Sequence, residues 1–141
     1  MFKSSPKGSC YCIDCLLVLN DENYIIVSNW NGEINKIDVR LRKSVLQYQG
    51  HKNNHSEIGF QMDTQCTNLF AVGSDSCVRV WDVGSGRLEH QHRVVDACKD
   101  RQGGGNAELP IVEYSDCWGG DMTNSGLLCM YGTKYQMWPL V

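Results

Sequence analysis

The sequence predicts an all-β fold of short strands, and three observations support that prediction. Apolar residues gather in short runs that are closed by turn residues such as Asn31-Gly32 and Gly84-Ser85-Gly86. No segment keeps the apolar period of about 3.6 residues that marks an amphipathic helix. Part of the sequence also recurs at an offset of 44 residues, which indicates a repeated structural unit.

Eleven strands are expected, each an apolar run bounded by turn-forming residues. The first four runs are 10–19, 24–28, 33–39 and 44–48, with Asn20-Asp21 and Asn31-Gly32 as turns between them and Gly50 closing the fourth. The next four are 58–62, 69–73, 77–83 and 87–94, with turns at Asp75-Ser76 and at Gly84-Ser85-Gly86. The last three are 111–114, 127–131 and 135–140.

Two segments lie outside this pattern of strands. Residues 1–9 are polar and include Pro6 and Gly8, so we expect a flexible N-terminus. Residues 95–109 form a polar insertion with a run of three glycines at 103–105, which predicts a flexible loop. No lysine-serine or lysine-threonine pair follows the glycines, so the run is not a phosphate-binding loop.

The internal repeat keeps its register through a turn and the strand that follows it. Residues 24–44 align with residues 68–88, and a weaker third copy lies at 126–140. The aligned pairs are Val27 with Ala71, Asn31 with Asp75, Ile34 with Val78, Ile37 with Trp81, Asp38 with Asp82, and Lys43 with Arg87. In the third copy Trp138 takes the place of Trp81.

The second copy carries Gly50-His51 and then, thirty residues later, Trp81-Asp82. This pattern resembles the WD repeat of β-propeller proteins. The resemblance implies a partial WD-repeat propeller of about three four-stranded blades, at approximately 10–49, 50–94 and 107–141. Propellers have roughly four to eight blades, so this chain alone is not expected to close the ring. Further blades or self-association would be needed.

The WD-repeat resemblance also implies a structural network within a blade. In the family, the histidine of Gly-His, a turn aspartate, a strand serine or threonine and the tryptophan share buried hydrogen bonds. His51, Asp75 and Trp81 match three of these positions, whereas Ala71 stands at the fourth, so the network is expected to be incomplete. We assign these residues a structural role.

A narrower resemblance rests on the stretches Val45–His51 and Ala71–Asp75, and on the insertion followed by Pro110–Ser115 and Leu127–Met130. This succession is similar to the C-terminal blades of WD-repeat substrate receptors for cullin-RING ubiquitin ligases, in particular the DDB1- and CUL4-associated factor 4 family. In that class a Trp-Asp-x-Arg tetrad contacts the ligase adaptor. Ile37-Asp38-Val39-Arg40 matches it with isoleucine in place of tryptophan, so Asp38 and Arg40 are the candidate adaptor-binding residues, with a solvated loop arginine as the alternative.

Other residue groups give weaker signals. Cys10, Cys12 and Cys15 lack the paired spacing of zinc sites, and the remaining cysteines are scattered, so we expect buried free thiols. His90 and His92 share a strand face, but no third ligand lies at fixed spacing. Trp118, the large aromatic of the loop 116–121, is either an exposed partner anchor or a packing residue.

Composition excludes several classes of function. The net charge is −3, which gives no footprint for nucleic acid, and no apolar run is long enough to span a membrane. No secretory signal begins the sequence, so the predicted location is the cytoplasm or the nucleus. No catalytic motif, metal site or cofactor site emerges, and the chain is not expected to be an enzyme.

The sequence therefore predicts a protein–protein interaction scaffold. The leading hypothesis is part of a substrate receptor that recruits targets to a cullin-RING E3 ubiquitin ligase, with the adaptor and cullin complex and an unknown substrate as partners. The alternatives are a general WD-repeat scaffold in another complex, a metal- or nucleotide-dependent enzyme, and a truncated propeller product without independent activity.

Overall fold

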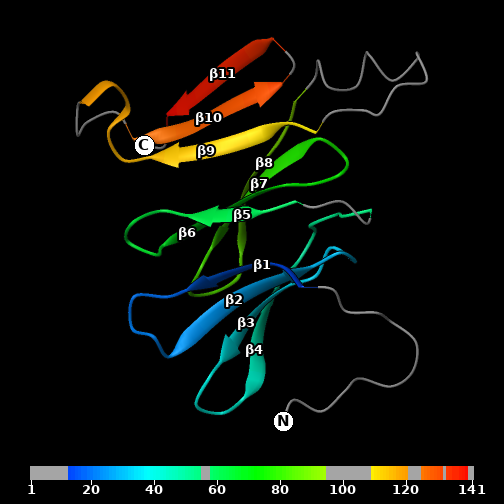
Figure 1. The fold of residues 1–141 in the computed structure, drawn as a ribbon, viewed down its shortest axis with the longest axis vertical. Coiled ribbons are helices and arrows are strands. Elements are labelled where there is room, and N and C mark those ends of the chain that lie inside the picture. Colours follow the sequence, from blue (N-terminus) through cyan, green and yellow to red (C-terminus); the bar gives the residue numbers. More distant parts are fainter. Residues whose placement is uncertain (1–12, 55–57, 95–108, 121–124, 132, 140–141) are drawn as a thin grey trace.

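The computed structural model describes residues 13–54, 58–94, 109–120, 125–131 and 133–139, which form three antiparallel sheets (Figure 1). Eleven strands lie close to the eleven apolar runs of the sequence, so the all-β prediction is confirmed. The described residues also include one short 3-10 helix, η2, at Trp118–Gly120. The predicted insertion at 95–109 falls, except for Leu109, outside the described residues, as does the N-terminal segment 1–9.

Each sheet is a meander in which neighbouring strands are consecutive in the chain, and we call each sheet a blade. Blade 1 contains β1 (Ile13–Val18), β2 (Tyr24–Asn29), β3 (Ile34–Asp38) and β4 (Lys43–Tyr48). Blade 2 contains β5 (Phe60–Met62), β6 (Asn68–Val72), β7 (Cys77–Asp82) and β8 (Leu88–Arg93). Blade 3 contains β9 (Ile111–Ser115), β10 (Gly126–Tyr131) and β11 (Lys134–Pro139).

Blade 3 differs from the four-stranded blade that the repeat predicts. Its strand order is β11-β10-β9, so it has three strands in the part of the chain that the structure describes. In blades 1 and 2 the fourth strand pairs with the third, as β4 pairs with β3 and β8 with β7. In blade 3 the corresponding place is beside β11, where the described residues form no fourth strand.

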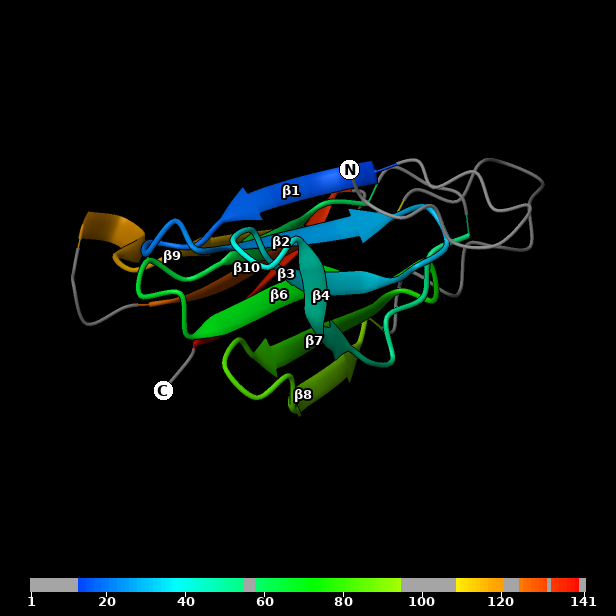
Figure 2. The same ribbon diagram turned by 90° about the horizontal axis from the view of Figure 1, so that it is seen from below.

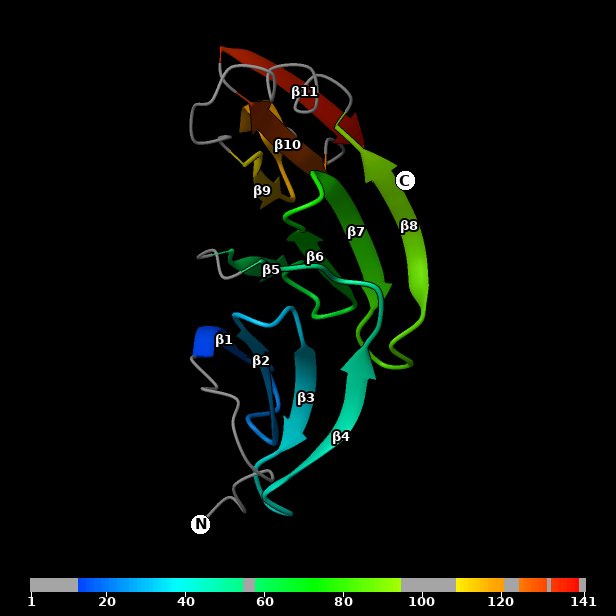
Figure 3. The same ribbon diagram turned by 90° about the vertical axis from the view of Figure 1, so that its right-hand side faces the viewer.

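The three blades lie side by side, with the first strands β1, β5 and β9 along one edge of the molecule (Figure 3). Figure 2 shows the same stack from below, with the blades overlapping in the line of sight. The apolar cores lie between the blades rather than inside them. One core cluster joins blade 1 to blade 2 through Ile26, Tyr48 and Trp81, and a second joins blade 2 to blade 3 through Phe70 and Leu127.

This arrangement follows from the period-2 alternation of the strands. Along β6, Leu69 and Ala71 join the core cluster on the blade 1 side, whereas Phe70 and Val72 join the cluster on the blade 3 side. Because both faces of blade 2 are covered, β6 is a continuous apolar run rather than an alternating one. A blade of this kind buries its faces only against its neighbours.

Candidate interaction site

The tight turn after β3 holds the candidate pair Asp38 and Arg40. One carboxylate oxygen of Asp38, Oδ1, accepts hydrogen bonds from the backbone N–H groups of Arg40 at 2.9 Å and Leu41 at 3.1 Å. Aspartate is favoured in turns because its short carboxylate can satisfy backbone donors two and three residues ahead. The buried Asp38 side chain therefore fixes the conformation of the turn from which Arg40 projects.

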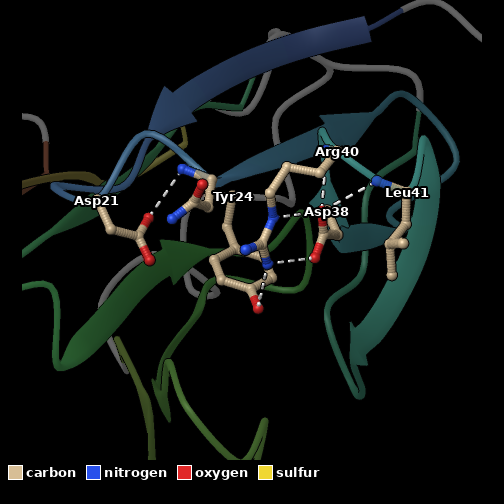
Figure 4. A network of polar contacts seen from close by, with 6 residues as sticks. Asp21, Tyr24, Asp38, Arg40 and Leu41 are labelled. Atoms are coloured by element: carbon tan, nitrogen blue, oxygen red, sulfur yellow. Dashed lines mark hydrogen bonds and ion pairs between the residues drawn. The ribbon is translucent and has the colours of Figure 1, made fainter.

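The guanidinium group of Arg40 lies against the same carboxylate in a two-point contact (Figure 4). Its Nε donates to Oδ1 of Asp38 at 3.2 Å and its Nη2 donates to Oδ2 at 2.8 Å. These hydrogen bonds lower the pKa of Asp38 to about 2. The Asp38 side chain is 3% exposed and the Arg40 side chain 57% exposed, so a buried anion orients a cation that solvent and partners can reach.

Tyr24, the first residue of β2, supports the arginine from the neighbouring strand. It pairs directly with Asp38 in the sheet register. Its hydroxyl oxygen accepts a hydrogen bond from Nη2 of Arg40 at 3.3 Å, and the arginine lies over its ring at 5.5 Å from the centroid. The amino group of Lys36 also lies over this ring, at 4.5 Å. Two cations thus share one aromatic platform, an arrangement stabilised by the ring's negative face.

The β1–β2 turn is joined to the Arg40 turn and completes this surface. The N–H of Val39 donates to the carbonyl oxygen of Asn23 at 3.0 Å, and the N–H of Asn23 donates to Asp21 Oδ1 at 3.0 Å. Residues 36–43 carry four basic side chains and one acidic side chain, which is the buried Asp38. We call Tyr24, Lys36, Asp38 and Arg40 the arginine platform.

The arginine platform is suited to binding rather than to a reaction. A guanidinium group with a fixed orientation offers planar recognition of carboxylates and carbonyl groups, and arginine is frequent among residues that dominate protein interfaces. Cations presented from a rigid turn also favour partners with an acidic surface.

The equivalent turn of blade 2 has the same aspartate but no arginine. Oδ1 of Asp82 accepts hydrogen bonds from both the backbone N–H and the hydroxyl of Ser85, at 2.6 and 2.7 Å. Gly84 stands where blade 1 has Arg40. The turn architecture is therefore a property of the repeat, whereas the projecting cation belongs to blade 1.

The expected WD network around Trp81 is only partly present. The buried indole of Trp81 lies edge-on to the His51 ring at 6.2 Å, so the structure brings these two residues together. The indole N–H donates to the carbonyl oxygen of Gln49 at 2.8 Å, as expected if Ala71 supplies no hydroxyl. Nδ1 of His51 is buried without a hydrogen-bond partner.

Asp75 differs from the expectation, because its carboxylate is bound by Arg79 rather than by His51. The Arg79 guanidinium donates to both oxygens of Asp75, at 3.0 and 2.6 Å, and its Nε donates to Gln91 at 3.1 Å. Burial raises the pKa of Asp75, but its hydrogen bonds with Arg79 and the charge of Arg79 outweigh that effect and lower the pKa. A charged guanidinium competes better for a carboxylate than a neutral imidazole does.

The remaining candidates are placed as follows. Trp118 is half-buried, and its indole N–H donates to the carbonyl oxygen of Gly126 at 2.9 Å, so its ring is tied to blade 3. His90 and His92 are exposed on β8, and His92 packs edge-on to Trp138 at 4.7 Å. Over the described residues, no group of three or more histidine, cysteine or acidic side chains is placed to hold a metal ion.

Cys15 is free and half-buried, whereas Cys10 and Cys12 lie outside the described residues. Sequence reasoning missed Tyr24, Lys36 and Arg79. Lys36 and Asp38 are two residues apart and so share one strand face, which the sequence alone predicts. The pairing of Tyr24 with Asp38 can be known only from the sheet register. Arg79 stands four residues after Asp75, and its burial was not evident because arginine is rarely buried.

Comparison with known proteins agrees with the family resemblance that the sequence shows. Residues 8–137 match the family described as the DDB1- and CUL4-associated factor 4 β-propeller domain. The chain is 30% identical over 115 residues to human DDB1- and CUL4-associated factor 4, covering 82% of this chain and 22% of that protein. It is 29% identical over 116 residues to the human DDB1- and CUL4-associated factor 4-like protein 2, covering 82% and 28%.

Solved structures show the same fold. The WD40 repeats of RRP9 superpose with a TM-score of 0.64 at 13% sequence identity, covering 95% of this chain and 37% of that one. The structure of U3-55K gives the same TM-score and identity over 38% of its length. These likenesses confirm the predicted partial WD-repeat propeller, which is not closed within this chain.

Proposed function

Because the chain belongs to the DDB1- and CUL4-associated factor 4 β-propeller family, we propose that it is part of a substrate receptor that recruits targets to a cullin-RING E3 ubiquitin ligase. The chain spans less than a third of the length of its curated human relatives, 22% of one and 28% of the other. The receptor role therefore concerns the larger propeller to which these blades correspond.

The observation that carries the proposal is the arginine platform. Asp38 and Arg40 occupy the second and fourth positions of the tetrad that contacts the ligase adaptor in this class. The turn holds Arg40 exposed in one orientation, so little side-chain entropy is lost when a partner binds it. Ile37 replaces the tetrad tryptophan, whereas the charged contact is formed by Asp38 and Arg40.

The proposed mechanism is recruitment. A receptor that holds a target beside the ligase raises the target's effective concentration near the transfer machinery. The ligase subunits would supply the chemistry, which agrees with a WD-repeat fold and family that point to a non-catalytic role. The partners we propose are the ligase adaptor, the cullin complex and an unidentified substrate protein. No described helix is long and apolar enough to cross a membrane.

The test is co-precipitation of the tagged 141-residue chain with the ligase adaptor and the cullin from cell extract. We expect Arg40→Glu to abolish adaptor capture, because it places a second carboxylate beside Asp38 and reverses the charge offered to the partner. Arg40→Gln, which removes the charge without adding an opposing one, should weaken capture by at least about tenfold, the effect of losing one interface hot spot.

The matched control is Arg87→Glu. Arg87 is also an exposed arginine paired with a carboxylate two residues away, Glu89, but it lies on blade 2 outside the arginine platform. Adaptor capture should survive this substitution. Undiminished capture by a folded Arg40→Glu variant would remove Arg40 from the proposal. Absence of the adaptor and cullin from the wild-type capture would favour a WD-repeat scaffold of another complex or an inactive propeller segment.

We place this recruitment in the cytoplasm or the nucleus, following the prediction from the sequence. Microscopy of the tagged chain tests that location independently of adaptor binding. Signal confined to a secretory compartment would contradict it.

A further inference from the structure

Both ends of the blade stack present exposed apolar sheet faces. On blade 1 the outward face is built by Leu16, Val18, Ile25, Val27 and Ile37, which lie opposite one another in the register of β1, β2 and β3. Leu16 is 48% exposed and Val18 53% exposed. We call these five residues the blade 1 end face.

The opposite end of the stack has a second such face. On blade 3, Met130 of β10 lies between Ile111 of β9 and Tyr135 of β11, and Leu128 lies beside Met137. The exposed fractions are 63% for Ile111, 48% for Met130, 77% for Tyr135 and 48% for Met137. We call these residues the blade 3 end face. Large exposed apolar patches on a soluble protein mark interaction surfaces.

The repeat shows what kind of surface each face fits. The blade 1 end face is equivalent, at the offset of 44 residues, to the face of blade 2 that blade 1 covers. Ile25 corresponds to Leu69 and Ile37 to Trp81, and both Leu69 and Trp81 are fully buried. One repeat later, the same surface is therefore the core of a blade–blade interface.

The blade 3 end face corresponds in the same way to the face of blade 2 that blade 3 covers. In the third copy of the repeat, Leu128 stands at the position of Phe70 and Met130 at that of Val72. Phe70 is 1% exposed and Val72 5% exposed, within the core cluster between blades 2 and 3. Each end face thus continues an interface that the chain already forms twice.

We infer that the two end faces bind each other between two copies of this chain, head to tail. The blade 3 end face of one copy covers the blade 1 end face of the other, in the way that blade 2 covers blade 3. Such heterologous contacts form a ring when the rotation closes. Since propellers have roughly four to eight blades and each chain has three, two copies give the number of blades that a ring can hold.

Light scattering coupled to size-exclusion chromatography measures this association on the 141-residue chain. We expect a concentration-dependent species of twice the chain mass of 15.9 kDa. Val18→Glu on the blade 1 end face and Met130→Lys on the blade 3 end face should each shift the dimerisation constant by at least about tenfold, because each buries an unpaired charge at both contacts. Leu41→Glu, at a position 60% exposed but off both faces, should leave dimerisation unchanged.

Mixing the two single-face variants distinguishes a head-to-tail contact from a symmetric one. The Val18→Glu chain keeps an intact blade 3 end face, and the Met130→Lys chain keeps an intact blade 1 end face. An equimolar mixture should therefore recover dimers through one intact contact and one Glu–Lys contact. If the dimer were symmetric about either face, one of the variants would still dimerise alone.

Circular dichroism keeps the test decisive, because both substituted residues are exposed and folded variants should retain the wild-type β spectrum. A wild-type chain that stays monomeric up to about 100 µM, well above the affinities of specific protein pairs, would overturn the proposal. The end faces would then belong to further blades of a longer or different polypeptide. Dimers that survive both folded single-face variants would also overturn it.

Discussion

At the scale of single residues, His51 stands out because its side chain is half-buried and its Nδ1 atom is buried without a hydrogen-bond partner. Burial lowers its pKa to about 4, and the neighbouring Arg79 charge acts in the same direction, against the opposing effect of Asp75. The neutral imidazole is therefore the form that the fold accommodates. In an unfolded chain the same histidine titrates near 6.5.

This difference predicts that the protein loses stability between pH 7 and pH 5. In that window the unfolded chain takes up a proton on His51 and the folded chain does not, so stability falls as pH falls. The expected loss down to pH 5 is about 2 kcal/mol, because below the unfolded pKa of 6.5 each pH unit costs about 1.4 kcal/mol. Urea unfolding midpoints measured at a series of pH values check it.

His51→Phe should flatten this pH dependence, because it keeps an aromatic ring beside Trp81 and removes the titrating group. The matched control is His90→Gln on the exposed strand β8, which should leave the slope unchanged. Asp38, with a pKa of about 2, titrates below this window. An unchanged slope in the His51→Phe variant would mean that another group is responsible.

At the scale of elements, the connection between blades 1 and 2 is clamped between two turns. A Cβ atom on Gly32, in the β2–β3 turn, would lie 2.7 Å from the backbone nitrogen of Asn53. On the other side, the N–H of Ser74 in the β6–β7 turn donates to the carbonyl oxygen of Lys52 at 2.7 Å. The path from β4 to β5 is thus fixed by backbone proximity.

Gly32→Ala should therefore destabilise the protein by at least about 1–2 kcal/mol, the cost of a left-handed backbone for a residue with a side chain. The φ angle of Gly32 is +85°, and the clash with backbone adds to that cost because backbone cannot rotate away. Gly59→Ala is the control, since a Cβ there meets only the Cys15 sulfur at 4.0 Å. Equal melting temperatures for the two variants would contradict this account.

Most strands were predictable from the sequence because their apolar runs end at turn residues and the repeat aligns the runs, whereas β8 is a polar, exposed strand. The left-handed turn also follows the repeat, since Gly32 aligns with Ser76, whose φ is +60°. The arginine platform was predictable only in part. Arg40 follows from the tetrad pattern, whereas Tyr24 is brought to it by strand pairing, and the Asp75–Arg79 pair depends on burial that composition disfavours.

At the scale of the whole molecule, the blades are joined by repeated face-to-face packing and by hydrogen bonds between neighbouring blades. The stability of such a stack is close to a sum of blade stabilities and neighbour interfaces, so separate parts can open independently. Gln61 on β5 provides one of the polar links between blades 2 and 3. Its amide nitrogen donates to Glu113 at 2.8 Å, and its amide oxygen accepts from the N–H of Tyr114 at 2.9 Å.

Gln61→Ala should loosen blade 3 while leaving blade 1 intact, because it removes two hydrogen bonds that link β9 to β5. We expect faster amide hydrogen exchange throughout residues 111–139, by a factor that reflects about 1 kcal/mol per lost hydrogen bond, and unchanged exchange in β2 and β3. Gln47→Ala is the control, since the amide oxygen of Gln47 accepts a hydrogen bond from the side chain of Gln49, two residues away on the blade 1 side of the molecule. Exchange that rises equally in all three blades would show that the stack opens as one cooperative unit, and the additive description of its blades would then fail.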